Sequence, residues 1–123
     1  MSWFNELEEV LNAVHNGIVA IDAEERVTIY NRQAERMLGV PAVKVFGKKI
    51  TDVLPTSELP AVLNSGKPQF GQKLELGDLI LVTNRTPIIE GDRVIGAIAV
   101  FRTVQLNSKI ITIVQLSYWI DWK

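Results

Sequence analysis

The stretch "VTNRTPI" at residues 82–88 places polar side chains inside an apolar, β-branched run. Residues two apart in an extended strand share a face, so Thr83 and Arg85 point to the same side. An arginine on a face that borders a cavity can bind a carboxylate through two parallel hydrogen bonds. The alternative, which the sequence alone favours, is an arginine at the sheet surface paired with a nearby glutamate.

Tyr30 is a third candidate for contact with a ligand, because its hydroxyl can donate a hydrogen bond. It closes a short run, "RVTIY", in which polar and apolar residues alternate. An equally good alternative is that Tyr30 flanks the edge of the sheet, without contact to a ligand. The candidate ligand-binding residues are therefore Tyr30, Thr83 and Arg85.

Few other residues could carry out chemistry. The chain has no cysteine, which removes thiolate metal sites, cysteine nucleophiles and flavin–cysteine photochemistry. Its one histidine, His15, lies near a predicted helix end, where capping or surface positions are usual. No set of histidines or carboxylates has the spacing of metal ligands, and there is no phosphate loop or nucleophile elbow. We therefore expect no catalytic residues, no metal site and no enzyme activity.

Composition is that of one packed domain. Of 123 residues, 47% are hydrophobic and 22% are charged, and the net charge of −1 argues against a nucleic-acid partner. The acidic start "MSWFNELEEV" lacks the apolar core of a signal peptide. No uncharged apolar run approaches the roughly 20 residues of a bilayer span. These features predict a cytoplasmic protein without membrane contact.

Residues 1–16 are predicted to form an amphipathic helix that Gly17 ends. Its apolar stripe repeats at steps of four, three and four residues and consists of Trp3, Leu7, Val10 and Val14. Such a stripe packs either on its own domain or against a second copy of the chain. We weight these two interpretations equally.

The core domain, residues 17–103, alternates strand and helix patterns. Strands are expected near 17–22, 26–30, 69–76, 79–88 and 93–103, and short helical turns between prolines at 41–68. This order predicts an α+β fold, with a five-stranded antiparallel sheet and helices crossing one face. A small, mainly apolar cavity is expected between the two layers.

Asn31 stands where the second strand gives way to a helix. Its side chain can accept a hydrogen bond from a free N–H of the first helical turn, which predicts an N-cap rather than a catalytic role. Gly39 and Pro41 then end that helix.

Three segments together resemble a PAS domain, and the resemblance covers about residues 8–102. They read "GIVAIDAEERVTIYNRQAERMLG", "GKKITDVLP" and "NRTPIIEGDRVIGAIAVFR". The resemblance implies strand order 2-1-5-4-3, a sensory or interaction role, and frequent dimers. Asn31 matches the asparagine that this family commonly places at the start of the first helix after the second strand.

Within that family, the motifs are most similar to the PAS modules of sigma-54-dependent bacterial transcription activators, although sensor histidine kinases carry close relatives. We therefore expect a sensor and dimerisation module, with an ATPase or kinase output domain in the full-length protein. The alternatives are a metabolite-binding domain of a sensor histidine kinase and a purely structural interaction domain.

The resemblance also bears on cofactors. Light-responsive flavin and coumarate PAS domains attach their chromophore through cysteine, which this chain lacks. Haem-binding members usually use a histidine on the helix before the third strand, and residues 50–66 contain none. No cofactor is therefore demanded, and a non-covalent small ligand stays open.

Residues 104–123 form an apolar C-terminal extension that departs from the family pattern. The family usually continues its last strand into Asp-x-Thr, where this chain has Thr103-Val104-Gln105. The run "SKIITIVQLSYWIDW" at 108–122 predicts a helix packed against a second chain, although its β-branched residues leave a strand open. We expect a homodimer whose interface includes Trp3, Leu7, Val10, Val14, Ile113 and Trp119.

Overall fold

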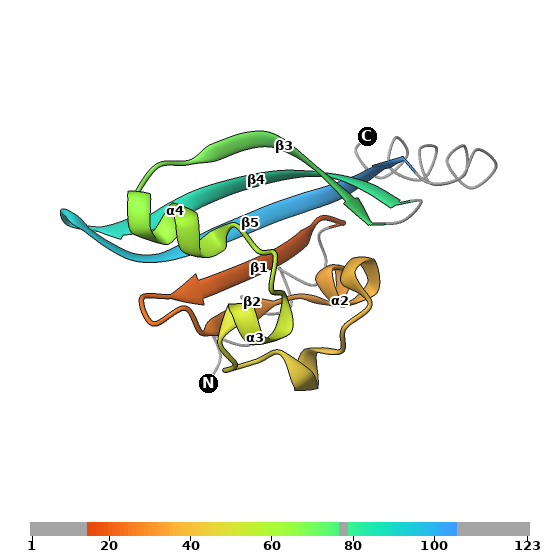
Figure 1. Ribbon diagram of the computed structural model, residues 1–123, viewed down its shortest axis with the longest axis horizontal. Helices are drawn as coiled ribbons and strands as arrows, with labels where there is room; N and C mark the ends of the chain where they lie inside the picture. The colour runs from red at the N-terminus through yellow and green to blue at the C-terminus, as the bar shows by residue number, and fades with distance from the viewer. Residues whose placement is uncertain (1–14, 77–78, 106–123) are drawn as a thin grey trace.

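The computed structural model describes residues 15–76 and 79–105 (Figure 1). It consists of five strands, three short helices and one 3-10 turn. In chain order these are β1 (Gly17–Asp22), β2 (Val27–Tyr30), α2 (Arg32–Leu38), η1 (Ala42–Lys44), α3 (Ile50–Val53), α4 (Leu59–Ser65), β3 (Gln69–Leu76), β4 (Leu79–Glu90) and β5 (Arg93–Gln105).

The five strands form one antiparallel sheet in the order β2-β1-β5-β4-β3. This confirms the expected α+β fold and the strand order implied by the resemblance. The predicted strand limits are correct to within two residues, and β4 and β5 each run two residues further than expected. The two extra residues of β4 lie beside the hairpin at Gly91, where Glu90 pairs with Arg93. The two extra residues of β5 lie at the opposite end, where Gln105 pairs with Ile80.

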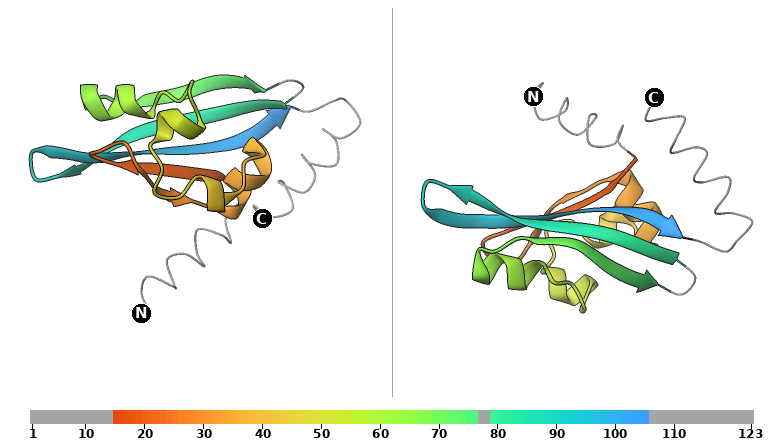
Figure 2. Two further views of the ribbon diagram at one scale, coloured as in Figure 1. Left: turned by 60° about the horizontal axis from the view of Figure 1, so that its bottom comes forward. Right: turned by 90° about the horizontal axis from the view of Figure 1, so that it is seen from above.

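The short helices cover one face of the sheet (Figure 2). Helix α4 packs against β4 and β5, and α2 packs against β1. Between the layers lies a core of alternate strand residues and apolar helix residues. Its fully buried members include Ile21, Val27, Val45, Ile50, Leu59, Val62 and Leu81.

Asn31 is the N-cap of α2, as predicted. Its Oδ1 accepts a hydrogen bond from the Ala34 N–H at 2.9 Å and a second from the Ile18 N–H at 2.9 Å. Its Nδ2 donates to the Asn16 carbonyl at 2.9 Å. The side chain thus joins the start of β1 to the start of α2. Gly39 then ends α2 in the left-handed conformation, also as predicted.

Gly17 opens β1 after a bend at residues 15–16. The helix that Gly17 is predicted to end lies outside the described residues. A methyl group on Gly17 would overlap the ring of Phe101, which lies opposite it on β5. Glycine is needed here because an aromatic ring occupies the space of a side chain.

Several predictions fall outside the described residues. The apolar stripe, the extension after Gln105 and all six interface residues are among them, so the homodimer stays a prediction. Within the described part of the chain, no helix has the length and apolar character needed to cross a bilayer.

Candidate ligand-binding site

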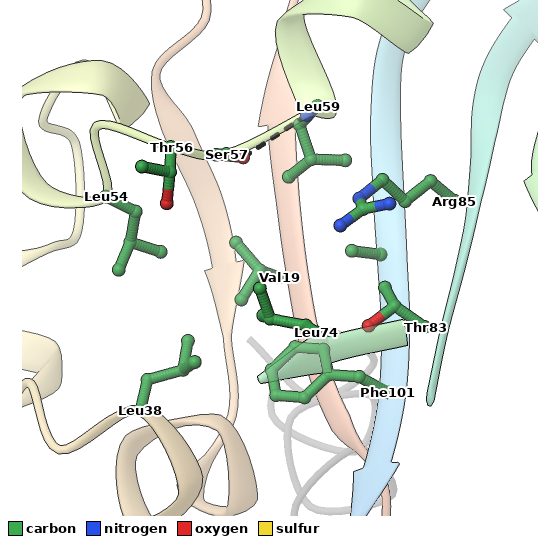
Figure 3. Close-up of a pocket in the computed structure, with 11 residues that line it drawn as sticks. Val19, Leu38, Leu54, Thr56, Ser57, Leu59, Leu74, Thr83, Arg85 and Phe101 are labelled. Carbon is green, nitrogen blue, oxygen red and sulfur yellow. Dashed lines mark hydrogen bonds between the residues drawn. The ribbon is translucent and has the colours of Figure 1, made fainter. Parts of the chain in front are cut away.

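A cavity of about 100 Å³ lies between the helix layer and the centre of the sheet. Strands β1, β3, β4 and β5 and the segment from α3 to α4 contribute to its lining (Figure 3). The lining residues are Val19, Leu38, Leu54, Thr56, Ser57, Leu59, Leu74, Thr83, Arg85, Ala99 and Phe101. The small apolar cavity expected from the sequence is therefore present.

Most of the wall is apolar. Val19 from β1 and Phe101 from β5 are both nearly fully buried, and Leu59 closes the cavity from α4. Alternation along the strands puts these side chains on the helix-facing side of the sheet. Water held against such walls finds few partners, so the few polar groups in the cavity determine what it can bind.

Thr83 contributes one of those polar groups. It is 3% exposed, and its Oγ1 finds no hydrogen-bond partner in the described part of the chain. Leaving a hydroxyl buried and unpaired costs about 1–3 kcal/mol. A group of this kind in a cavity wall is a candidate ligand contact.

Arg85 contributes the second polar group. It is 8% exposed, and its Nη1 donates to Gln69 Oε1 on β3 at 3.0 Å. Burial lowers the pKa of the Arg85 guanidinium below its usual range, while the exposed Glu58 acts in the opposite direction. A guanidinium nonetheless remains charged in proteins.

The position of Arg85 contradicts one of the two interpretations of "VTNRTPI", and carboxylate binding stays a prediction. The sequence favoured an arginine at the sheet surface, and that prediction is wrong. Leu81, Thr83 and Arg85 alternate on the inward face of β4, and α4 packs over that strand. In Figure 3 the guanidinium of Arg85 and the hydroxyl of Thr83 extend from the same strand toward the apolar side chains of the cavity.

The segment 54–57 forms the rim of the cavity. Thr56 is exposed and Ser57 is half-buried, so the cavity reaches the surface here. Ser57 Oγ accepts a hydrogen bond from the Leu59 N–H at 3.2 Å at the start of α4. Sequence reasoning missed these rim residues, although "SELP" already carried the signal of a helix start.

Tyr30 is placed away from the cavity. Its hydroxyl donates a 2.7 Å hydrogen bond to the Val40 carbonyl, which ties β2 to the chain after α2. Burial, with a smaller contribution from Glu35, raises the pKa of Tyr30 to about 12. The structure therefore brings Thr83 and Arg85 together but does not bring Tyr30 to them.

Metal binding finds no support in residues 15–76 and 79–105. Within those ranges no three histidine, aspartate or glutamate side chains are grouped as metal ligands.

The sequence matches the family model of the PAS fold over residues 5–104, most of the chain. This chain belongs to the PAS family. The five-stranded sheet and the short helices on one face are thus features of a PAS domain.

Two curated relatives of this PAS domain come from Halalkalibacterium halodurans. The sensor protein CitS is 37% identical over 101 residues, which cover 80% of this chain and 19% of that protein. A probable C4-dicarboxylate sensor kinase is 39% identical over 97 residues, covering 79% of this chain and 18% of that protein. The chain thus spans about a fifth of the length of these relatives.

Solved structures agree on the fold. The PAS domain of the histidine kinase ThkA superposes with a TM-score of 0.64 at 19% identity, covering 72% of this chain and 99% of that domain. The two relatives described above are named as a sensor protein and a probable sensor kinase, and neither is named as a sigma-54-dependent activator. The narrower resemblance expected from the motifs is therefore not supported, and the sensor-kinase alternative is.

Proposed function

We propose that this chain is the sensory PAS module of a bacterial sensor kinase, and that it binds a small molecule without catalysing a reaction. The observation that carries the proposal is the cavity, in which a buried arginine and an unpaired threonine hydroxyl lie among apolar walls. A purely structural domain would gain stability from filling that space with side chains.

The kinase context rests on the relatives. Both match along most of this chain, and one is named a probable C4-dicarboxylate sensor kinase. That name applies to a protein of which this chain matches 18%, so it does not say which segment binds the signal. It does support organic acids as the class of signal, which agrees with an arginine in the cavity.

Occupancy of the cavity can be transmitted through the central strands. Thr83 and Arg85 lie on β4, which is paired along most of its length with β5. Ala99 and Phe101 place β5 itself in the cavity wall. If this strand pair has two arrangements, a ligand that binds one of them more tightly increases the population of that arrangement. The size of the shift is set by the difference in the ligand's affinity for the two arrangements. In the proposed kinase, this difference alters the output domain.

A domain exchange tests the proposal. Residues 1–123 replace the matching segment of the C4-dicarboxylate sensor kinase, and autophosphorylation is measured with and without a mixture of bacterial metabolites. We expect phosphorylation that responds to the mixture, and a response that is lost on Thr83→Val or Arg85→Met. The matched control is Arg102→Met, because Arg102 is an exposed arginine of β5.

A response that both cavity variants leave unchanged, or a chimera indifferent to every metabolite, would contradict the proposal. Mass spectrometry of the denatured protein, expressed as the 123-residue chain, adds a direct search for a co-purified ligand.

A further inference from the structure

The charge of the cavity limits the charge of its ligand. Among the eleven described residues that line it, Arg85 alone carries a charged side chain. Its one hydrogen-bond partner in the described part of the chain is the neutral Gln69, and no carboxylate there lies within ion-pairing distance. Glu58 is close enough to affect the pKa of Arg85 but is itself exposed to solvent. The cavity therefore contains one positive charge without an ion-pair partner, and its charge is complementary to a ligand with one negative charge.

The donors suit a planar anion. A guanidinium carries five N–H donors in a fixed fork, of which the structure assigns one bond to Gln69 Oε1. Gln69 is the register partner of Arg85, so the neighbouring strand holds the arginine in place. Thr83 stands two residues away on the same face of β4 and adds a free hydroxyl. Together they can serve both oxygens of a carboxylate.

The walls and the volume limit the rest of the ligand. Away from Thr83 and Arg85, the cavity is lined mainly by aliphatic and aromatic side chains, including Val19, Leu54 and Phe101. An engineered cavity of about 150 Å³ holds benzene, which has six heavy atoms. This cavity, at about 100 Å³, therefore takes a group of about that size or smaller. A second carboxylate held among these apolar side chains would lose hydration without gaining a partner, and one at the rim would meet only the neutral side chains of Thr56 and Ser57.

We propose that the cavity binds a short monocarboxylate, with its carboxylate on Arg85 and Thr83 and its aliphatic tail among the apolar side chains. This inference rests on the proposed sensory function and narrows its ligand. It differs from the dicarboxylate in the name of one relative, because Arg85 is the one charged side chain in the described lining of this cavity.

Calorimetric titration of the 123-residue chain with three related compounds tests the charge and the tail. Butyrate has one carboxylate and a short tail, butyramide has the same shape without the charge, and succinate has a second carboxylate in place of the methyl end. We expect butyrate to bind at least about tenfold more tightly than either of the others. Butyramide lacks the charge-assisted hydrogen bonds to Arg85, and succinate brings a second charge that has no cationic partner in the cavity. Equal or tighter binding of succinate or butyramide, or no binding of butyrate, would overturn the inference.

Variants test the assigned contacts. Thr83→Val keeps the shape of the side chain and removes the hydroxyl, and it is expected to weaken butyrate binding about tenfold. Arg85→Lys keeps the charge but loses the fork, and should also weaken binding, whereas Arg102→Met should not. Thermal melting shows that each variant is folded. Butyrate affinity that is unchanged in folded Thr83→Val and Arg85→Lys proteins would overturn the inference.

These results are distinct from a failure of the proposed function. The chimeric kinase could respond to metabolites and lose that response in the Thr83 and Arg85 variants, while the 123-residue chain shows no preference for butyrate. That combination would refute only the proposed class of ligand. A chimera that ignores both cavity variants would refute the sensory role as well.

Discussion

Asn31 joins three backbone segments through one amide group. It caps α2 at Ala34, accepts the Ile18 N–H and donates to the Asn16 carbonyl, so truncation leaves several buried groups unpaired. We expect Asn31→Ala to lower the free energy of unfolding by about 2–4 kcal/mol, more than a cap alone would cost. Urea denaturation measures this change.

Asn64→Ala is the control for that measurement, because Asn64 is an exposed residue of α4. It should change the unfolding free energy by no more than about 0.5 kcal/mol. Similar midpoints for the two variants would show that the Asn31 contacts contribute little.

Tyr30 predicts a pH dependence at the alkaline end. Its pKa of about 12 in the folded protein lies above the usual value of about 10 in an unfolded chain. Between these values the folded state holds the phenolic proton that the unfolded state has lost, so stability is complete below pH ~10 and falls as the pH rises toward 12.

In Tyr30→Phe this titration is absent, and stability should fall less steeply over the same range. Urea midpoints of both proteins across that range provide the comparison. Parallel curves would show that the Tyr30 hydroxyl is not protected by folding.

The two polar residues of the cavity were partly predictable from the sequence. Alternation along a strand placed Thr83 and Arg85 on one face. It could not say whether that face was inward, because this depends on α4 crossing β4 and on Gln69 pairing opposite Arg85. Tyr30 was predicted as a ligand contact, but its hydroxyl donates a hydrogen bond to the Val40 carbonyl instead. No local sequence pattern indicates that partner.

At the level of elements, the strands were predictable because their patterns are local. Alternating and β-branched runs predicted the limits of all five strands to within two residues, and turn residues predicted the position of the hairpin at Gly91. The segment 54–57 was not recognised as part of the site, because its position over the cavity depends on how α3 and α4 pack on the sheet. The close approach of Phe101 to Gly17 was not predicted for a similar reason, since the two residues are distant in sequence.

Gly96 tests the close packing of β1 on β5. A methyl group at this buried position would overlap the backbone carbonyl of Ile21, and a backbone atom cannot rotate away as a side chain can. We expect Gly96→Ala to cost about 1–3 kcal/mol in unfolding free energy, from overpacking.

Thermal or urea unfolding measures this cost, with Thr28→Ala as the control, because Thr28 is exposed on β2. The control should lose less than about 1 kcal/mol. A Gly96→Ala protein as stable as the parent would show that the two strands separate easily at this point.

At the level of the whole molecule, the sequence predicts a homodimer through the N-terminal stripe and the apolar extension. Light scattering at micromolar concentration should give about twice the chain mass of 13.8 kDa. Because β5 continues to Gln105, removal of residues 106–123 leaves the described sheet complete and should shift the mass toward the monomer.

Unchanged dimer mass and unchanged melting temperature after this truncation would exclude the extension from the interface. A mass near 13.8 kDa for the untruncated 123-residue chain would exclude the dimer itself.

The central claim is that the cavity at Thr83 and Arg85 is the site where this PAS domain binds its ligand. Amide chemical shifts of the ¹⁵N-labelled chain, recorded as butyrate is added, test it most directly. The account predicts saturable shifts at Ser57, Thr83 and Arg85, little change at Thr28 on the edge strand, and loss of the shifts in Thr83→Val. Shifts confined to residues outside the cavity wall, or the same shifts in Thr83→Val, would contradict it.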